Sequence, residues 1–370
     1  MKHNKRNRSK KLLAYALCFC ILCTMGILSE QTIIHAVETI QPSLDMSNAA
    51  LSQTSVTGYL VPTYTYGSRT QYGNAEFDIA LQNPIVLSDN TPGVNLSCKS
   101  SNKNVQADAS LTKNILHLRV HGTKTCSTKL TVSIGGKNFQ ITVSLITVKI
   151  SANSLLVAKG KTKKLKINGC PNKNIKWSSS NKKIASVNKK GVIKAKRIGN
   201  AVITAKINGK PVGCAVSVTT RQLQNVCKRA TYIGTHWSYS QARRAQEGFY
   251  DCSSLVWKAY TQYTGLNFGS SSYPGTSASE SAWCRDNNKM ISGGYSYRKV
   301  EKMQLNPGDL IFKSTNLGNP YNTTYHVEMF TGYTCLGYNS KGKPVVTSLW
   351  ASRAPGYGAA NGSLLARPTR

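Results

Sequence analysis

An internal repeat constrains the fold of this chain more than any other feature of its sequence. The segment 98–103 (CKSSNK) aligns with the segment 177–182 (WSSSNK), at an offset of 79 residues. A second pair of similar segments, 129–137 and 201–210, follows in the same order. Repeats of this length indicate tandem domains, because solenoid repeats are shorter units that stack on their neighbours.

Both copies consist of short runs in which apolar and polar residues alternate, as in half-buried strands. In the first copy the runs 130–134 and 139–143 flank Gly135-Gly136-Lys137-Asn138, which predicts a β-hairpin. In the second copy, Lys164-Leu165-Lys166-Ile167 places lysines on the solvent side of a strand. We therefore predict two all-β sandwiches, at residues 76–147 and 148–220. Residues 37–75 show little periodicity and are predicted to be a linker.

The N-terminus has the pattern of a secretory signal peptide over residues 1–36. A basic run, 2–11, precedes an apolar run, 12–28, and Ile34-His35-Ala36 provides a cleavage site with a small residue. The alternative is an uncleaved membrane anchor, since the apolar run approaches the length of a span. No later segment is apolar enough to span a membrane, so we expect an exported protein with no stable membrane insertion after cleavage.

The cysteines and the charge fit export. Eight cysteines follow the signal region, and pairing Cys98 with Cys126 and Cys170 with Cys214 would keep disulfides within separate domains. Residues 146–220 contain 17 Lys and Arg and no Asp or Glu. Outside the cell this charge favours anionic wall polymers as partners. Nucleic acid is excluded by the signal peptide and by the lack of a nucleic-acid motif, and the remaining alternative for this domain is a spacer.

Residues 221–370 have a different character, which predicts an α+β domain. Two helices are expected, at 223–232 and from Cys252 onward, followed by strands at 305–312, 326–333 and 344–352. In the second helix Leu255, Val256, Ala259 and Tyr263 lie on one face. Cys252 then falls in the first helical turn, where the helix dipole favours a thiolate. The alternative is that Cys252 is half of a disulfide.

A thiolate nucleophile requires a nearby imidazole as its base. Of the six histidines, two lie in the signal region and two in the first sandwich, which leaves His236 and His326. His326 begins a predicted strand, from which its side chain could face the Cys252 helix. His236 lies in a loop and is expected to be a surface or substrate-groove residue. No spacing of His, Cys and carboxylates matches a metal-ligand set, so we expect neither a metal nor an organic cofactor.

Three blocks in this domain, 250–256 (YDCSSLV), 305–312 (LNPGDLIF) and 326–332 (HVEMFTG), resemble the NlpC family of cell-wall cysteine peptidases. The resemblance implies a compact papain-like fold and cleavage of peptidoglycan stem peptides. It implies Cys252 as the nucleophile and His326 as the base. It also implies that Tyr250, Asp251 and Ser253 line the substrate site.

The second sandwich resembles the bacterial Ig-like group 2 domain. The similar segments are 159–162 (KGKT), 175–181 (IKWSSSN), 184–188 (IASVN), 191–195 (GVIKA) and 199–205 (GNAVITA). The first sandwich matches this pattern only in layout. The expected architecture is therefore multidomain, with two all-β Ig-like sandwiches followed by an α+β papain-like cysteine peptidase domain at residues 221–370.

The sequence departs from the peptidase pattern behind the base. The family usually supplies a third polar residue from the strand after the His strand, and here that position is Trp350. Asn339 and Ser348 are alternative candidates. We predict an exported peptidoglycan hydrolase that is associated with the cell wall. One alternative is a non-catalytic adhesin that only binds wall peptides, and another is an amidase or transpeptidase that acts on a different amide.

Overall fold

The computed structural model describes residues 46–369, with gaps at 67–68, 84–93, 172–173, 317 and 353–359. The predicted signal peptide, residues 1–36, lies outside the described residues. None of the helices in the described part of the chain combines the length and the apolar character that a membrane crossing requires.

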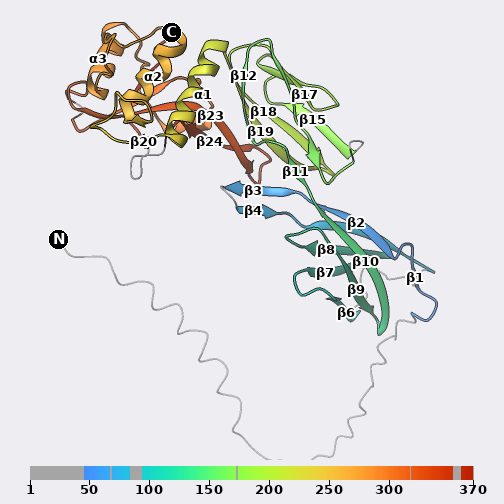
Figure 1. Cartoon of the computed structure of the whole chain (residues 1–370). Coiled ribbons are helices and arrows are strands. Elements are labelled where there is room, and N and C mark those ends of the chain that lie inside the picture. Colours follow the sequence, from blue (N-terminus) through green and yellow to red (C-terminus); the bar gives the residue numbers. More distant parts are fainter. Residues whose placement is uncertain are drawn as a thin grey trace, which may run out of the picture. The chain divides into compact units, whose positions relative to one another are not determined.

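The first β-region, residues 46–148, contains two four-stranded sheets that share one hydrophobic core (Figure 1). One sheet has the order β1 (Ala50–Leu51), β5 (Ala75–Gln82), β8 (Ile115–His121) and β7 (Gln106–Thr112). The other has the order β2 (Ser55–Leu60), β10 (Lys137–Thr147), β9 (Cys126–Ile134) and β6 (Leu96–Ser100). The hairpin predicted between β9 and β10 is confirmed. Its two-residue turn consists of Gly135 and Gly136, both at positive φ, where glycine avoids a Cβ clash.

Four strands lie within residues 50–66 and 69–72, so the linker predicted for residues 37–75 is wrong over these parts. Besides β1 and β2, these parts contain β3 (Pro62–Tyr66) and β4 (Arg69–Tyr72). In β2 the inward positions are Val56, Gly58 and Leu60. A Cβ at Gly58 would lie 2.5 Å from the Cβ of Ala75, so this position requires glycine. The glycine interrupts the apolar alternation and hides the strand from a pattern search.

The second β-region, residues 149–219, has the expected all-β structure. One sheet has the order β12 (Ser154–Ala158), β19 (Lys210–Thr219), β18 (Gly199–Ile207) and β15 (Ile175–Ser179). The other has the order β13 (Thr162–Lys164), β17 (Val192–Ala195) and β16 (Ala185–Val187), and β11 (Lys149–Ile150) pairs with β14 (Ile167–Asn168). Leu165 and Ile167 are buried while Lys164 and Lys166 are exposed, which confirms the lysines on the solvent side.

The remaining residues form a C-terminal domain of helices and strands, as expected. It contains α1 (Arg221–His236), β20 (Ser238–Tyr239), β21 (Phe249–Tyr250), α2 (Cys252–Thr264), α3 (Ser277–Asp286) and α4 (Tyr297–Glu301). The strands β22 (Leu310–Ser314), β23 (Thr324–Tyr338), β24 (Pro344–Trp350) and β25 (Leu364–Ala366) follow. The central sheet has the order β25-β22-β23-β3-β4, so two strands from residues 62–72 extend it, and β24 also pairs with β23. The strand predicted at 344–352 is β24, which ends at Trp350, two residues before the predicted end.

The two faces of the central sheet contribute to different hydrophobic clusters. Val327 and Met329 of β23 pack in a cluster with residues of α1 and α2. Phe330 and Tyr333, on the same strand, pack in a cluster that also includes Ala215 of β19. The strand that begins near His326 therefore packs on the helices through one set of side chains and on the second β-region through another.

All eight cysteines of the described residues are free thiols, so neither of the two pairings considered from the sequence is formed. Cys98 lies opposite Val132 in the β6–β9 ladder, six residues along β9 from Cys126. Cys214 is buried in the core of the second β-region, whereas Cys170 packs against a different cluster. The spacing along the sequence matched separate domains, but the strand register keeps these thiols apart.

Candidate active site

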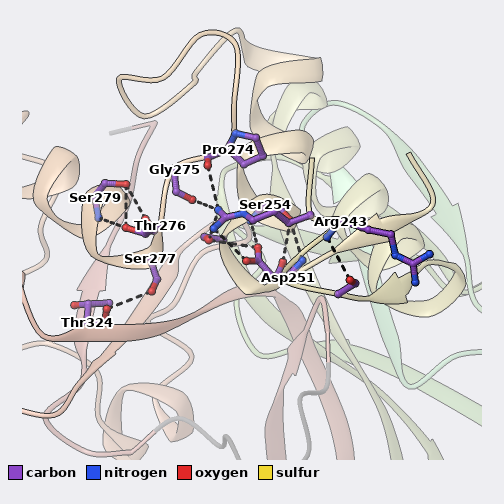
Figure 2. Close-up of polar contacts among 12 residues, drawn as sticks. Arg243, Asp251, Ser254, Pro274, Gly275, Thr276, Ser277, Ser279 and Thr324 are labelled. Atoms are coloured by element: carbon purple, nitrogen blue, oxygen red, sulfur yellow. Dashed lines mark hydrogen bonds and ion pairs between the residues drawn. The ribbon is translucent and has the colours of Figure 1, made fainter. Parts of the chain in front are cut away.

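Cys252 is the first residue of α2, as the sequence predicts. Asp251 caps the helix by accepting a hydrogen bond from the backbone N–H of Ser254 at 2.8 Å. The Ser254 hydroxyl accepts in return from the backbone N–H of Asp251 at 2.8 Å (Figure 2). This reciprocal capping box fixes how the chain enters the helix. It therefore fixes the orientation of Cys252 at the N-terminal end of α2.

The buried face of α2 differs from the predicted one at a single position. Leu255, Val256 and Ala259 are buried as expected, but Tyr263 is exposed and Tyr260 is fully buried instead. Tyr260 and Tyr263 lie three positions apart, about 60° around the helix, so both border the same apolar face, and Tyr263 is in the last turn of α2. The Tyr260 hydroxyl donates to the carbonyl oxygen of Gly308, which ties α2 to the turn before β22.

The thiol of Cys252 is buried, with 8% of the residue exposed. This burial raises the pKa of the Cys252 thiol, and the nearby carboxyl groups of Asp251 and Glu280 act in the same direction. Hydrogen bonds with the backbone of Val327 and Ser253 oppose the rise in pKa. The lowered pKa expected from the helix start is therefore wrong for this structure, because desolvation outweighs the helix terminus.

Arg244 connects the start of α2 to the loop before α3. Its Nη1 lies 3.2 Å from Asp251 Oδ2, and its Nη2 donates to the Ser253 hydroxyl at 2.9 Å. Nη2 also donates to the carbonyl oxygens of Pro274 and Gly275, which Figure 2 shows beside the Asp251 end of the helix. One partly buried guanidinium thus holds the residues on both sides of Cys252 against this loop.

The loop and α3 in turn contact the start of β23. Thr276 caps α3 by accepting from the backbone N–H of Ser279 at 3.1 Å. The Ser277 hydroxyl donates to the backbone carbonyl of Thr324 at 3.4 Å, two residues before His326 (Figure 2). A chain of polar contacts therefore runs from the Cys252 end of α2 to the His326 end of β23.

Glu280 is a second acidic group near Cys252, and it is fully buried. Neither of its carboxyl oxygens has a hydrogen-bond partner among the residues that the structure describes. Burial raises the pKa of Glu280 well above its usual value, and the nearby Asp251 adds to the rise. A buried carboxyl without a partner avoids much of the desolvation cost by keeping its proton.

We expect Glu280→Gln to stabilise the protein at neutral pH and to have little effect below about pH 4. The folded wild type keeps a proton that the unfolded chain releases as pH rises above the ordinary glutamate pKa. Stability attributable to this group therefore falls with rising pH, and glutamine removes that dependence. Thermal unfolding of both proteins as a function of pH measures the difference. A wild type that gains stability relative to the variant as pH rises would mean that Glu280 is ionised and stabilised.

His326 lies near the start of β23 and is buried. It is adjacent in sequence to Val327, whose backbone bonds to the Cys252 thiol. The structure thus brings the start of β23 to the thiol. On the same strand, Glu328 Oε1 lies 3.3 Å from His326 Nε2. Lys313, opposite His326 in the β22–β23 ladder, has its Nζ 4.0 Å from Glu328 Oε1. His326, Glu328 and Lys313 therefore form a buried polar cluster.

Two family models match the chain in the order that the sequence predicts. The bacterial Ig-like domain (group 2) matches residues 146–212, and the NlpC/P60 family matches residues 234–353. The C-terminal domain is an NlpC/P60 domain. Members of this family are cysteine peptidases, and the matched range contains both Cys252 and His326.

Similarity to solved structures is low. An invasin structure, titled a bacterial integrin-binding protein, is 16% identical at a TM-score of 0.28 and covers 46% of this chain. This chain spans 38% of that structure's length. A 282-residue intimin fragment in complex with a receptor domain is 11% identical at a TM-score of 0.28, covering 82% of this chain and 95% of the fragment. No curated protein matches the chain.

Trp350 does not stand beside His326 in the NlpC/P60 domain. It lies opposite Phe330 in the β23–β24 ladder, four residues from His326 along β23. Its ring makes edge contacts with Phe330 and Tyr295, at centroid distances of 5.6 and 6.2 Å. Trp350 is therefore a packing residue.

The two other candidates for the third polar residue are wrong. Ser348 lies opposite Tyr333, seven residues along β23 from His326. Asn339 lies in the turn between β23 and β24, where its side-chain oxygen accepts from the backbone N–H groups of Lys341 and Lys343 at 3.0 Å. Asn339 therefore stabilises the turn, and neither residue lies near His326 along the hairpin.

The predicted substrate-lining residues Tyr250, Asp251 and Ser253 surround Cys252 in the NlpC/P60 domain, and all three are buried. Asp251 and Ser253 bind Arg244, and the Tyr250 hydroxyl donates to the carbonyl oxygen of Gly234 at 3.4 Å. In this structure their polar groups are occupied by contacts within the protein.

Four polar residues of this site were not predicted, namely Arg244, Glu280, Lys313 and Glu328. A sequence signal exists for Glu328, because residues two apart on a strand share a face and an acidic residue among Val, Met and Phe is unusual. Arg244 lies in an irregular segment, where the sequence shows only that the loop before the nucleophile has two adjacent basic residues, Arg243 and Arg244, in place of the glycine pair that is usual in the family. Within the described residues, no group of three or more His, Cys, Asp or Glu could hold a metal ion.

Proposed function

We propose that this protein is an exported peptidoglycan hydrolase that cleaves amide bonds in the stem peptides of the cell wall. One observation carries the proposal. The Cys252 thiol, at the start of α2, bonds to the backbone of Val327, directly after His326. A nucleophile at a helix start beside a strand histidine is the arrangement that thiol hydrolysis needs. Membership of the C-terminal domain in a cysteine peptidase family supports this interpretation.

In the proposed reaction, His326 takes the proton of the Cys252 thiol as the sulfur attacks the carbonyl carbon of the substrate amide. Backbone N–H groups at the start of α2 stabilise the resulting oxyanion. When the carbon–nitrogen bond breaks, His326 gives the proton to the leaving amine. Water then attacks the thioester with the help of His326, which releases the carboxylic acid and restores the thiol.

The raised pKa of Cys252 fits this chemistry if the proton passes directly to His326. A thiol with a raised pKa is a poor nucleophile by itself, since only the thiolate attacks. If the proton is transferred to a neighbouring imidazole during the attack, the thiol does not need to be ionised before the substrate binds. The same raised pKa favours the alternative function, a wall-binding protein whose peptidase-like domain has no activity.

Digestion of purified cell walls tests the proposal. We expect the wild-type protein to release soluble fragments and Cys252→Ala to release none, because alanine has no nucleophile. Cys284→Ala, which removes a different buried thiol of the same domain, should retain activity. Equal behaviour of the wild type and Cys252→Ala would contradict the proposal and favour the wall-binding alternative. Mass spectrometry of the fragments identifies the new termini and separates an endopeptidase from an amidase or a transpeptidase.

We further propose that the second β-region binds anionic wall polymers. Its exposed lysines include Lys164, Lys166, Lys182 and Lys183, and residues 146–220 contain no acidic residue. Electrostatic retention on walls should fall steeply as the salt concentration rises, because salt screens exposed charges. Retention of the Cys252→Ala protein on walls measures this without digestion. Binding that does not change with salt would favour the spacer alternative.

A further inference from the structure

A histidine that serves as a base for a thiol needs a fixed ring and a fixed tautomer. One ring nitrogen must present its lone pair to the thiol, and the other must carry a hydrogen that an acceptor holds. This inference concerns that acceptor and rests on the proposed function. The family position for it is Trp350, which packs against aromatic rings at the end of β24.

Glu328 has the required position. It is two residues after His326 on β23, so both side chains lie on the same face of the strand. Its Oε1 is 3.3 Å from His326 Nε2, and each of the two side chains is 5% exposed. Water therefore has little access to this contact, and a polar interaction in such a site is stronger than one at the surface.

The contact also selects a tautomer. An ionised carboxylate can only accept a hydrogen bond, so His326 Nε2 must carry the hydrogen. His326 Nδ1 then keeps its lone pair and can accept the thiol proton. The same carboxylate stabilises the imidazolium that forms when the proton arrives.

A buried carboxylate needs a counter-charge to remain ionised. Lys313 supplies one from the neighbouring strand β22, with its Nζ 4.0 Å from Glu328 Oε1 and its side chain 8% exposed. In the ladder it lies opposite His326, so the three residues occupy adjacent positions on one face of two strands. Lys313 thus places a cationic group beside the Glu328 carboxyl within the same buried cluster.

We propose that Glu328 is the positioning residue for His326, in place of the polar residue that the family takes from the next strand. The acceptor therefore lies on β23, the strand of the base, and not on the neighbouring strand β24. At the position on β24 where the family has its polar residue, Trp350 packs on Phe330 and Tyr295.

The variants Glu328→Ala and Glu328→Gln test this role. Alanine removes the acceptor, so we expect kcat on wall peptides to fall by about 10- to 100-fold with KM nearly unchanged. Glutamine retains a side-chain oxygen that can accept from Nε2, so most of kcat should return. Asp286→Asn is the control, since it changes an exposed carboxyl of the same domain that pairs with Arg285 at the surface, and it should leave kcat near the wild-type value.

A kcat of Glu328→Ala within about twofold of the wild type would overturn the proposal, because a positioning residue acts on the chemical step. Equal losses in the alanine and glutamine variants, in proportion to lost thermal stability, would also overturn it, since they would indicate a structural role.

A second measurement separates this proposal from the proposed function. The rate at which iodoacetamide alkylates Cys252 at neutral pH, followed by peptide mass spectrometry, reports the pairing of thiol and imidazole without any substrate. We expect slower alkylation in Glu328→Ala than in the wild type and in Glu328→Gln. A wild type that digests no wall would contradict only the proposed function. Equal alkylation rates in all three proteins would overturn the role of Glu328.

Discussion

His326→Gln is expected to lower the rate of wall-peptide hydrolysis by about 10²- to 10⁴-fold, the range that a positioned general base contributes. Glutamine has a similar size and can still bond to Glu328, so the cluster around β23 should remain folded. It cannot take the Cys252 proton at neutral pH. The loss should appear in kcat, measured on soluble stem peptides, with a small change in KM.

His236→Gln is the matched control for this experiment. His236 is the other histidine of the C-terminal domain, and it is exposed at the end of α1, where its ring stacks on Tyr232 at 4.3 Å. Its replacement should leave kcat and KM unchanged. If His236→Gln lost activity and His326→Gln kept it, the base would be His236 and not His326.

Arg367→Ala is expected to destabilise the protein by about 3 kcal/mol, because it leaves a buried carboxylate without its partner. Arg367 binds Asp309 through two contacts, at 2.7 and 2.8 Å, and Asp309 is fully buried. Burial raises the pKa of Asp309, and the guanidinium acts in the opposite direction. Without Arg367 the carboxyl binds its proton more tightly in the folded state. The deficit in stability should therefore grow as pH rises from about 4 toward neutral.

Arg285→Ala is the control for this comparison. Arg285 Nε lies 2.7 Å from Asp286 Oδ1, the same distance as in the buried pair, but both side chains are about half exposed. Water and salt screen an exposed pair, so its loss should leave the melting temperature almost unchanged. Urea unfolding of the wild type and of both variants measures the free energy of unfolding that each substitution removes. Similar losses would mean that burial does not determine the strength of the Asp309–Arg367 pair.

The sequence predicted those parts of the fold that local patterns determine. The hairpin at Gly135–Gly136 and the helix that begins at Cys252 follow from turn residues and from periodicity, and both are present. Strand β2 was missed because Gly58, which packs against Ala75, interrupts the alternation that identifies strands. Tyr260 replaced Tyr263 in the core because the apolar face of a helix is wide enough for either residue.

The candidate site was less predictable, because its electrostatics come from contacts between distant segments. The side chain of Arg244 reaches Asp251 and also the backbone of the 274–275 loop, about 30 residues away in sequence. Glu280, on α3, also lies near Asp251. Neither contact has a sequence pattern. Burial, with smaller contributions from Asp251 and Glu280, reverses the expected direction of the Cys252 pKa.

Strand β23 begins near the candidate base and continues into a hydrophobic cluster shared with the second β-region. Phe330 and Tyr333 are fully buried in this cluster, together with Ala215 of β19. Asn200 of the same β-region donates to the backbone carbonyls of Met303 and Leu305, at 2.9 and 2.7 Å. An NlpC/P60 domain cut free at residue 221 would present this aromatic surface to water and would tend to aggregate. A piece of the chain suited to expression and to transplantation into another protein therefore retains the Ig-like segment, and it also retains β3 and β4, which pair with β23 in the central sheet.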